Sequence, residues 1–270
     1  MIRLKNLDAY KLKWIAIVAM VVSHLPYIFW DVLPMPLNMI FGPIGGLTFP
    51  IMAYFVTEGY RHTSSIKKYM LRLLIFGLIA VPFHMVVIDF PTLNIMFTIL
   101  LSLLVLMLYD KLDRVLFWLL FVVIVTPLSF MFFEHYAFGV LMVVLFHALK
   151  DEKKRRVIPP MVAGTCWILL GLLGVWGIHM QEAYYGAEVW QQMVLESSGG
   201  VVRSYDLMMS AEFMMALVPF GLVFFVAGFL LSQYNGERGK KSKWSKWLFY
   251  VAYPLHFAIL ILIAWFMGLV

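Results

Sequence analysis

The feature that most constrains this chain is a succession of apolar runs, separated by short stretches that hold nearly all of the charge. Each run has about the 20 residues that a helix needs to cross a bilayer. The chain is 63% hydrophobic and 13% charged, whereas a soluble domain carries about 25% charged residues. The polar–apolar alternation that a membrane barrel needs is missing. The sequence therefore predicts an all-α, polytopic bundle of helices in a lipid bilayer.

We expect about nine transmembrane helices in a single domain that spans residues 1–270, because no repeat or low-complexity tract divides the chain. Gly45, Gly46 and Pro50 are expected to loosen the second helix. The connection at Phe133–Tyr136 is so short that the two helices on either side of it could merge. The expected ranges are roughly 13–31, 37–58, 67–88, 92–109, 115–132, 134–149, 160–178, 211–233 and 246–268.

The basic residues are distributed unevenly between the two sides of the predicted membrane. With the N-terminus in the cytoplasm, all of the 21 Lys and Arg except Arg203 precede the first helix or fall at the cytoplasmic ends of helices. This is the distribution that the positive-inside rule describes. The pattern predicts a cytoplasmic N-terminus and an extracytoplasmic C-terminus. It also explains the net charge of +6 without nucleic acid as a partner.

A cluster of charged residues lies where the second apolar run ends and the third begins, and consists of Glu58, Arg61, Lys67, Lys68 and Arg72. Charges at the edge of a bilayer core are costly unless they are paired or hydrated, so they indicate a functional site. Glu58 and Arg61 are three residues apart and share one helix face if the helix continues that far. For Lys67 and Lys68, an anchor at the lipid headgroups is an equally good explanation.

Two histidines lie inside apolar runs at opposite ends of the chain. His24 follows Lys13 by 11 residues and His256 follows Lys246 by 10, which at the helical rise places them about 16 Å and about 15 Å into the membrane. The sequence therefore predicts that both reach the same depth. They could serve as a helix–helix hydrogen-bond pair, or as an acid–base pair, because imidazole titrates near neutral pH. We expect no metal, since no third ligand accompanies them.

Other polar groups give weaker signals. His84 is expected toward the outer face, at an outer mouth or at the interface, and Asn94 is expected to cap the fourth helix. No serine triad, phosphate-binding loop, dinucleotide fingerprint or cysteine metal site is present in the sequence. The single cysteine, Cys166, excludes an internal disulfide.

Several segments resemble the TraX family of membrane acetyltransferases. They occur in the family's order in the two terminal thirds of the chain, whereas residues 115–210 carry little of the signature. The matching segments are Leu12–Ala16 with His24-Leu25-Pro26, Phe49-Pro50, Glu58–Thr63, Lys68–Leu73, Asn94–Thr98, Tyr234–Gly239 and Phe249–His256.

The resemblance implies an acetyltransferase of the cytoplasmic (inner) membrane, related to the acyltransferase-3-like superfamily, that takes acetyl from cytosolic acetyl-CoA. The acetyl acceptor would be a pilin, a peptide or a glycan, and the named family member acetylates F-type pilin. Lys13 and His24, with ten residues between them, resemble an arginine–histidine motif of that superfamily. Ser23 stands where TraX-like proteins commonly have Asp, so the carboxylate that would orient His24 is missing there.

The same residues suggest a mechanism. The phosphates of acetyl-CoA would bind the Glu58–Arg72 cluster, with Glu58 positioning Arg61 or Arg72, since arginine forks pair with phosphate oxygens. One of His24 and His256 would act as the base, and the other, or a backbone donor, would stabilise the oxyanion. Two alternatives use the same features without this chemistry: a transporter or flippase for an anionic small molecule, and a non-catalytic scaffold of a pilus or secretion system.

Overall fold

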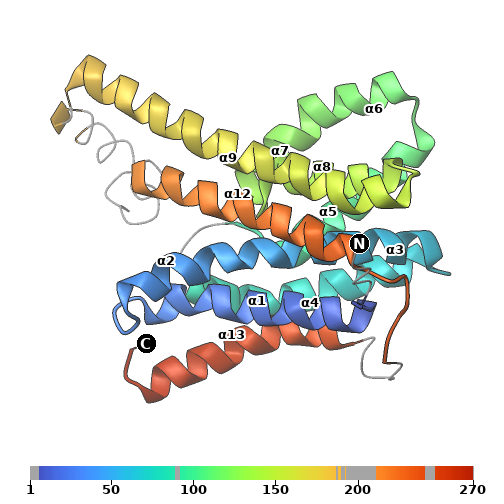
Figure 1. Cartoon of the computed structure of the whole chain (residues 1–270), viewed down its shortest axis with the longest axis horizontal. Helices are drawn as coiled ribbons and strands as arrows, with labels where there is room; N and C mark the ends of the chain where they lie inside the picture. The colour runs from blue at the N-terminus through green and yellow to red at the C-terminus, as the bar shows by residue number, and fades with distance from the viewer. Residues whose placement is uncertain are drawn as a thin grey trace.

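In the computed structural model, residues 6–88, 92–186, 188–189, 192, 211–240 and 247–269 are described, with the backbone alone for 211–216. Within these ranges the chain is helical apart from short connections (Figure 1). The elements are α1 (Ala9–Phe29), α2 (Met35–Ile44), the 3₁₀ turn η1 (Gly45–Leu47), α3 (Thr48–His62), α4 (Ile66–Val87), α5 (Ile95–Lys111), α6 (Arg114–Leu120), the π-helical stretch η2 (Phe121–Val125), α7 (Thr126–Phe132), α8 (Tyr136–Ala148), α9 (Glu152–Tyr185), α12 (Ala211–Ser232) and α13 (Leu248–Phe266).

Six helical segments of the described chain are long and apolar enough to cross a membrane. Their length and composition indicate a membrane protein. They are Ala9–Phe29, Met35–His62, Ile66–Val87, Arg114–Phe132, Glu152–Tyr185 and Leu248–Phe266. Tyr136–Ala148 and Leu217–Ser232 are shorter apolar helices. Each of the nine expected ranges contains helix, but the number of crossings stays a prediction.

The helix boundaries differ most from expectation in two places. The seventh range, expected at 160–178, is a helix of 34 residues (α9), about 51 Å long. The sixth, expected at 134–149, is a helix of 13 residues (α8), about 20 Å long. The two helices around Phe133–Tyr136 do not merge, because the backbone there leaves the helical region at Phe133 and turns at His135.

The second segment is interrupted as its glycines predict. Between α2 and α3 the chain tightens into η1, where it passes very close to α1. A Cβ added at Gly45 would lie 2.8 Å from Oγ and Cβ of Ser23, so a side chain at this position would clash. One turn further on, the Thr48 hydroxyl donates to the carbonyl oxygen of Ala16. Glycine thus permits the close approach of η1 to the middle of α1.

Two helices from the second half of the chain, α9 and α12, run side by side in Figure 1. They approach closely at Gly164 and Gly221, where a Cβ on either residue would lie about 2.5–2.6 Å from the carbonyl oxygen of the other. Close crossings at small residues are typical of membrane helices, which gain stability from van der Waals contact. On the other side of the bundle α13 packs along α4, with α1 beside both.

The charged segments meet at one end of the bundle, which we call the basic end. It comprises the starts of α1, α4, α6, α9 and α13 and the ends of α3, α5, α8 and α12. Backbone hydrogen bonds join two of these segments directly, from Ala9 to Glu237 and from Asn235 to Leu7. The convergence agrees with the sorting of basic residues by loop. Arg3, Lys5, Arg203, Lys241, Lys243 and Lys246 lie outside the described residues.

Candidate functional site

The structure brings the two membrane histidines together. The imidazole rings of His24 on α1 and His256 on α13 have centroids 4.8 Å apart, and both pack against Phe257, at 4.8 Å and 4.1 Å. His256 is buried and His24 is half-buried. The prediction that the two residues reach the same depth is confirmed.

The backbone fixes the tautomer of each ring. Nδ1–H of His24 donates to the carbonyl oxygen of Met20 at 2.6 Å, and Nδ1–H of His256 donates to that of Ala252 at 3.2 Å. A carbonyl only accepts, so the proton of each neutral ring is on Nδ1 and the lone pair is on Nε2. Nε2 of His256 is buried without a hydrogen-bond partner in the described part of the chain. Both rings therefore offer a basic nitrogen to a substrate.

Ser23 does not replace the orienting carboxylate that the sequence lacks at this position. Its hydroxyl donates to the carbonyl oxygen of Met20 at 2.9 Å, the same atom that holds Nδ1 of His24. A backbone carbonyl thus orients His24, and no charge is supplied from α1.

A second ionisable pair lies beside the histidines, and the sequence analysis missed it. Nε2 of His84 on α4 is 2.7 Å from Oε1 of Glu134 in the turn between α7 and α8. The His84 ring is 5.9 Å from that of Phe257, which also contacts His24 and His256. One signal could have found Glu134: it is a lone carboxylate between two apolar runs. In the described residues no group of three or more His, Cys, Asp or Glu is arranged to hold a metal ion.

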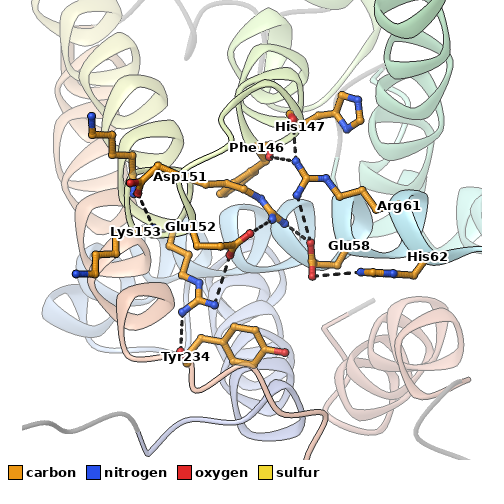
Figure 2. Close-up of polar contacts among 12 residues, drawn as sticks. Glu58, Arg61, His62, Phe146, His147, Asp151, Glu152, Lys153 and Tyr234 are labelled. Carbon is orange, nitrogen blue, oxygen red and sulfur yellow. Dashed lines mark hydrogen bonds and ion pairs between the residues drawn. The ribbon is translucent and has the colours of Figure 1, made fainter.

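At the basic end, Glu58 and Arg61 belong to a network that joins α3, α8 and α9 (Figure 2). The Arg61 guanidinium donates to the carbonyl oxygens of His147 at 2.7 Å and Phe146 at 3.4 Å. Arg61 is 3.9 Å from Glu58, and the closer partner of Glu58 is Arg155 on α9.

Arg155 is the residue around which this network forms. It is 1% exposed, it pairs with both Glu58 and Glu152, and its guanidinium lies 4.9 Å from the centre of the Tyr54 ring. A buried guanidinium needs this many partners, because an unpaired charge there would be very costly. The sequence analysis gave Arg155 no role beyond counting toward the topology.

The start of α9 is fixed by a helix cap that helps to place Arg155. The Asp151 carboxylate accepts from the backbone N–H groups of Lys153 and Lys154, both at 2.9 Å (Figure 2). The hydrogen bond from Lys154 holds the pKa of this exposed carboxylate below its usual value. Asp151 therefore stays charged at neutral pH and caps the helix.

Arg72, Lys67 and Lys68 lie apart from Glu58 and Arg61. Lys67 and Lys68 are exposed. The Arg72 guanidinium lies 5.7 Å from the ring centres of Tyr69 and Tyr250, and its Nε is buried without a hydrogen-bond partner among the described residues. The structure thus divides the five clustered residues: two are held in an internal network, and Arg72 faces the start of α13.

Lys13 reaches the same region from α1. Its ammonium lies 5.0 Å from the ring centre of Phe55 and 4.9 Å from that of Phe249. Within the described chain neither Lys13 nor Arg72 forms an ion pair with a carboxylate. Two cations beside the first turn of α13 are therefore available to an anion.

A small apolar cavity of about 20 Å³ lies between the basic end and the histidines. On α1 its lining runs from Ala16 to Met20, between Lys13 and His24, and on α13 from Phe249 to Tyr253, between the helix start and His256. Met52 and Met96 complete much of the wall. Methionine side chains are flexible and fill irregular gaps, so the wall of this cavity can rearrange at low cost.

Comparison with known proteins identifies the family. Residues 9–264 match the family model described as TraX protein. The chain belongs to the TraX family. This TraX-family protein is also 35% identical over 122 residues to the probable fimbrial assembly protein FimC, serogroup H1, of Dichelobacter nodosus. That match covers 38% of the chain and 48% of the relative, so the chain spans about half the length of the curated relative it matches. No solved structure matches this TraX-family protein.

Proposed function

We propose that this TraX-family protein is an integral membrane acetyltransferase that moves acetyl from cytosolic acetyl-CoA to an amine or hydroxyl of a pilin-like, peptide or glycan acceptor. The observation that carries the proposal is the pair of imidazoles from α1 and α13, 4.8 Å apart and each with Nδ1 held by a backbone carbonyl. A merely structural pair of histidines would be expected to bond to each other or to another side chain. Here the basic Nε2 of His256 is buried and has no partner in the described chain.

The donor would bind at the basic end, beside the start of α13. Arg72, Lys13, Lys67 and Lys68 would contact its phosphates, and the buried Nε of Arg72 has a hydrogen bond left to give. Arg61 already donates to the carbonyl oxygen of His147, and Glu58 is already paired with Arg155. Their contribution is therefore to hold α3, α8 and α9 in place. The pantetheine arm would follow the cavity lined by Ala16, Met20 and Phe249 toward the histidines.

The histidine pair would handle the proton of the acceptor. One imidazole takes the proton from the attacking N–H or O–H through Nε2. The second ring, when protonated, donates a hydrogen bond to the oxyanion that forms on the acetyl carbonyl. Because the rings are in contact, they titrate as a coupled pair. When the pair holds one extra proton, the neutral ring can act as the base and the protonated ring can donate to the oxyanion.

The proposal includes an orientation. We place the basic end in the cytoplasm and the C-terminus outside, since the basic residues gather at one end of the bundle. A periplasm-active reporter fused after Val270 should be active and a cytoplasm-active reporter silent. The opposite result would contradict this topology, because either the orientation or the odd number of crossings would be wrong.

Acetyl transfer itself is tested with purified protein in proteoliposomes, labelled acetyl-CoA, and an envelope extract as the source of acceptor. Wild-type protein should consume acetyl-CoA and label an extract component. The variant in which both His24 and His256 are replaced by Gln should bind acetyl-CoA but transfer nothing. Absence of transfer by folded wild-type protein would overturn the proposal.

A second candidate function is a non-catalytic scaffold of a pilus or other secretion system. The observation that favours it is the similarity to a probable fimbrial assembly protein, whose name refers to assembly and to no chemical reaction. The double histidine variant separates the two functions in a piliated host. A scaffold would support normal pilus assembly without these imidazoles, whereas the loss of an acetyl group from a surface component would indicate the enzyme.

A further inference from the structure

The His84–Glu134 pair is unusual for its burial. His84 is 2% exposed and the Glu134 side chain 22% exposed. The ring of His84 packs against Phe257, which also contacts His24 and His256. An ionisable pair buried inside a membrane protein is costly and therefore indicates a function.

The turn that carries Glu134 is strained and firmly held. His135 and Tyr136 both have positive φ, 60° and 48°, which is uncommon for residues other than glycine. Strain of this kind persists where the surrounding structure imposes it, often at functional sites. The His135 ring stacks on Phe49 at 4.2 Å and the Tyr136 ring on Phe130 at 5.1 Å. These stacking contacts hold the turn in place on both sides.

Hydrogen bonds to the start of α5 fix the position of Glu134 itself. The Thr98 hydroxyl donates to the carbonyl oxygen of Glu134 at 2.9 Å, and the backbone N–H of Leu93 donates to that of Phe132 at 2.7 Å. Asn94 ties the same segment to α4 through the carbonyl oxygen of Gly77, at 3.0 Å. Hydrogen bonds therefore connect α4, α5 and the turn into a rigid frame, and this frame directs the Glu134 carboxylate toward His84.

This frame places a negative charge beside the paired imidazoles. Phe257 touches the rings of His24, His256 and His84. Oε1 of Glu134 is 2.7 Å from Nε2 of His84, whose ring packs against the same Phe257 as both imidazoles. The residue next to His24, Ser23, supplies no charge.

We propose that Glu134, held in place by His84, is a positioning residue that stabilises the positive charge on the His24–His256 pair during acyl transfer. The inference rests on the proposed function. In the step it supports, the acceptor N–H or O–H proton moves to Nε2 of one imidazole as the new bond to the acetyl carbon forms. The C–S bond then breaks, and the imidazolium gives its proton to the departing thiolate. Glu134 stays ionised throughout and forms no bond to substrate.

The test removes the negative charge of Glu134 while keeping the shape of its side chain. Glu134→Gln retains an acceptor for the hydrogen bond from His84 and loses the negative charge. The expected result is a kcat lowered about 10- to 100-fold, the lower part of the range for acid–base assistance, with KM for acetyl-CoA unchanged. Glu134→Asp should recover part of the kcat because the charge returns. Glu182→Gln is the matched control: its carboxylate pairs with His179 at 3.3 Å on the surface of α9, and this variant should keep wild-type kcat.

Each outcome has a distinct meaning. Transfer by the wild type together with a wild-type kcat in folded Glu134→Gln would overturn this inference and leave the proposed function standing. Absence of transfer by the wild type would overturn both. If Glu134→Gln does not fold, His84→Gln replaces it, since the glutamine amide can still donate to the ionised carboxylate. That variant should keep kcat within about tenfold, and a larger loss would show that the imidazole rather than the carboxylate is required.

Discussion

The basic end and the histidine pair handle buried polar groups in opposite ways. At the basic end, Arg155 is 1% exposed and is paired with two carboxylates and an aromatic ring. In the histidine pair, each Nδ1 is held by the backbone, and the buried Nε2 of His256 has no partner among the described residues. A network in which the buried charge is paired stabilises the fold, even though Nε of Arg155 has no hydrogen-bond partner among the described residues. A partly unsaturated pair costs stability and leaves atoms free for chemistry, so damage to the two regions should be seen in different measurements.

The largest expected effect is at the histidine pair. His24→Gln should lower acetyl transfer about 10²–10⁴-fold, because the acid–base group is lost, while the unfolding midpoint in detergent and the affinity for acetyl-CoA stay near those of the wild type. Turnover by the folded variant is the measurement. Near-normal turnover would remove His24 from the mechanism and leave His256 as the candidate base.

The next effect is on stability at the basic end. Glu58→Ala should lower the free energy of unfolding by about 3 kcal/mol, because the buried guanidinium of Arg155 loses one of its two carboxylates. Thermal unfolding in detergent should show a lower midpoint, and kcat of the protein that stays folded should be unchanged. A variant as stable as the wild type would mean that Glu152 alone satisfies Arg155.

Donor affinity should separate two arginines that the sequence places in one cluster. Arg72→Ala should weaken acetyl-CoA binding about tenfold, or about 1.4 kcal/mol, and the wild-type affinity should fall as salt rises. Arg61→Ala should change it less, because that guanidinium is engaged by the carbonyl oxygens of His147 and Phe146. Equal losses in both variants would mean that the donor contacts α3 as well as the side of α4 that faces α13.

The smallest effect is expected at the exposed edge of the basic end. Asp110 accepts from Tyr60 and pairs with His147, both at 2.8 Å, but its side chain is 42% exposed. Asp110→Asn should therefore change the free energy of unfolding by less than about 1 kcal/mol. A loss as large as that of Glu58→Ala would show that the network depends on its exposed members as much as on its buried ones.

The sequence by itself determined the features that depend on one helix at a time. Hydrophobic length gave the helices, and the glycines at 45 and 46 marked the break in the second segment. The fixed rise of an α-helix placed His24 and His256 at one depth from residue counts alone, and the structure confirms that they meet.

Only the tertiary structure decided which side chains pair with each other. Glu58 and Arg61 are neighbours in sequence, yet the closer partner of Glu58 is Arg155, 97 residues away. Glu134 became part of a candidate site because a strained turn aims its carboxylate at His84. Partner choice depends on the rotation of each helix about its axis and on the depth at which each turn ends. Both are set by packing between helices, which residue spacing within one helix does not record.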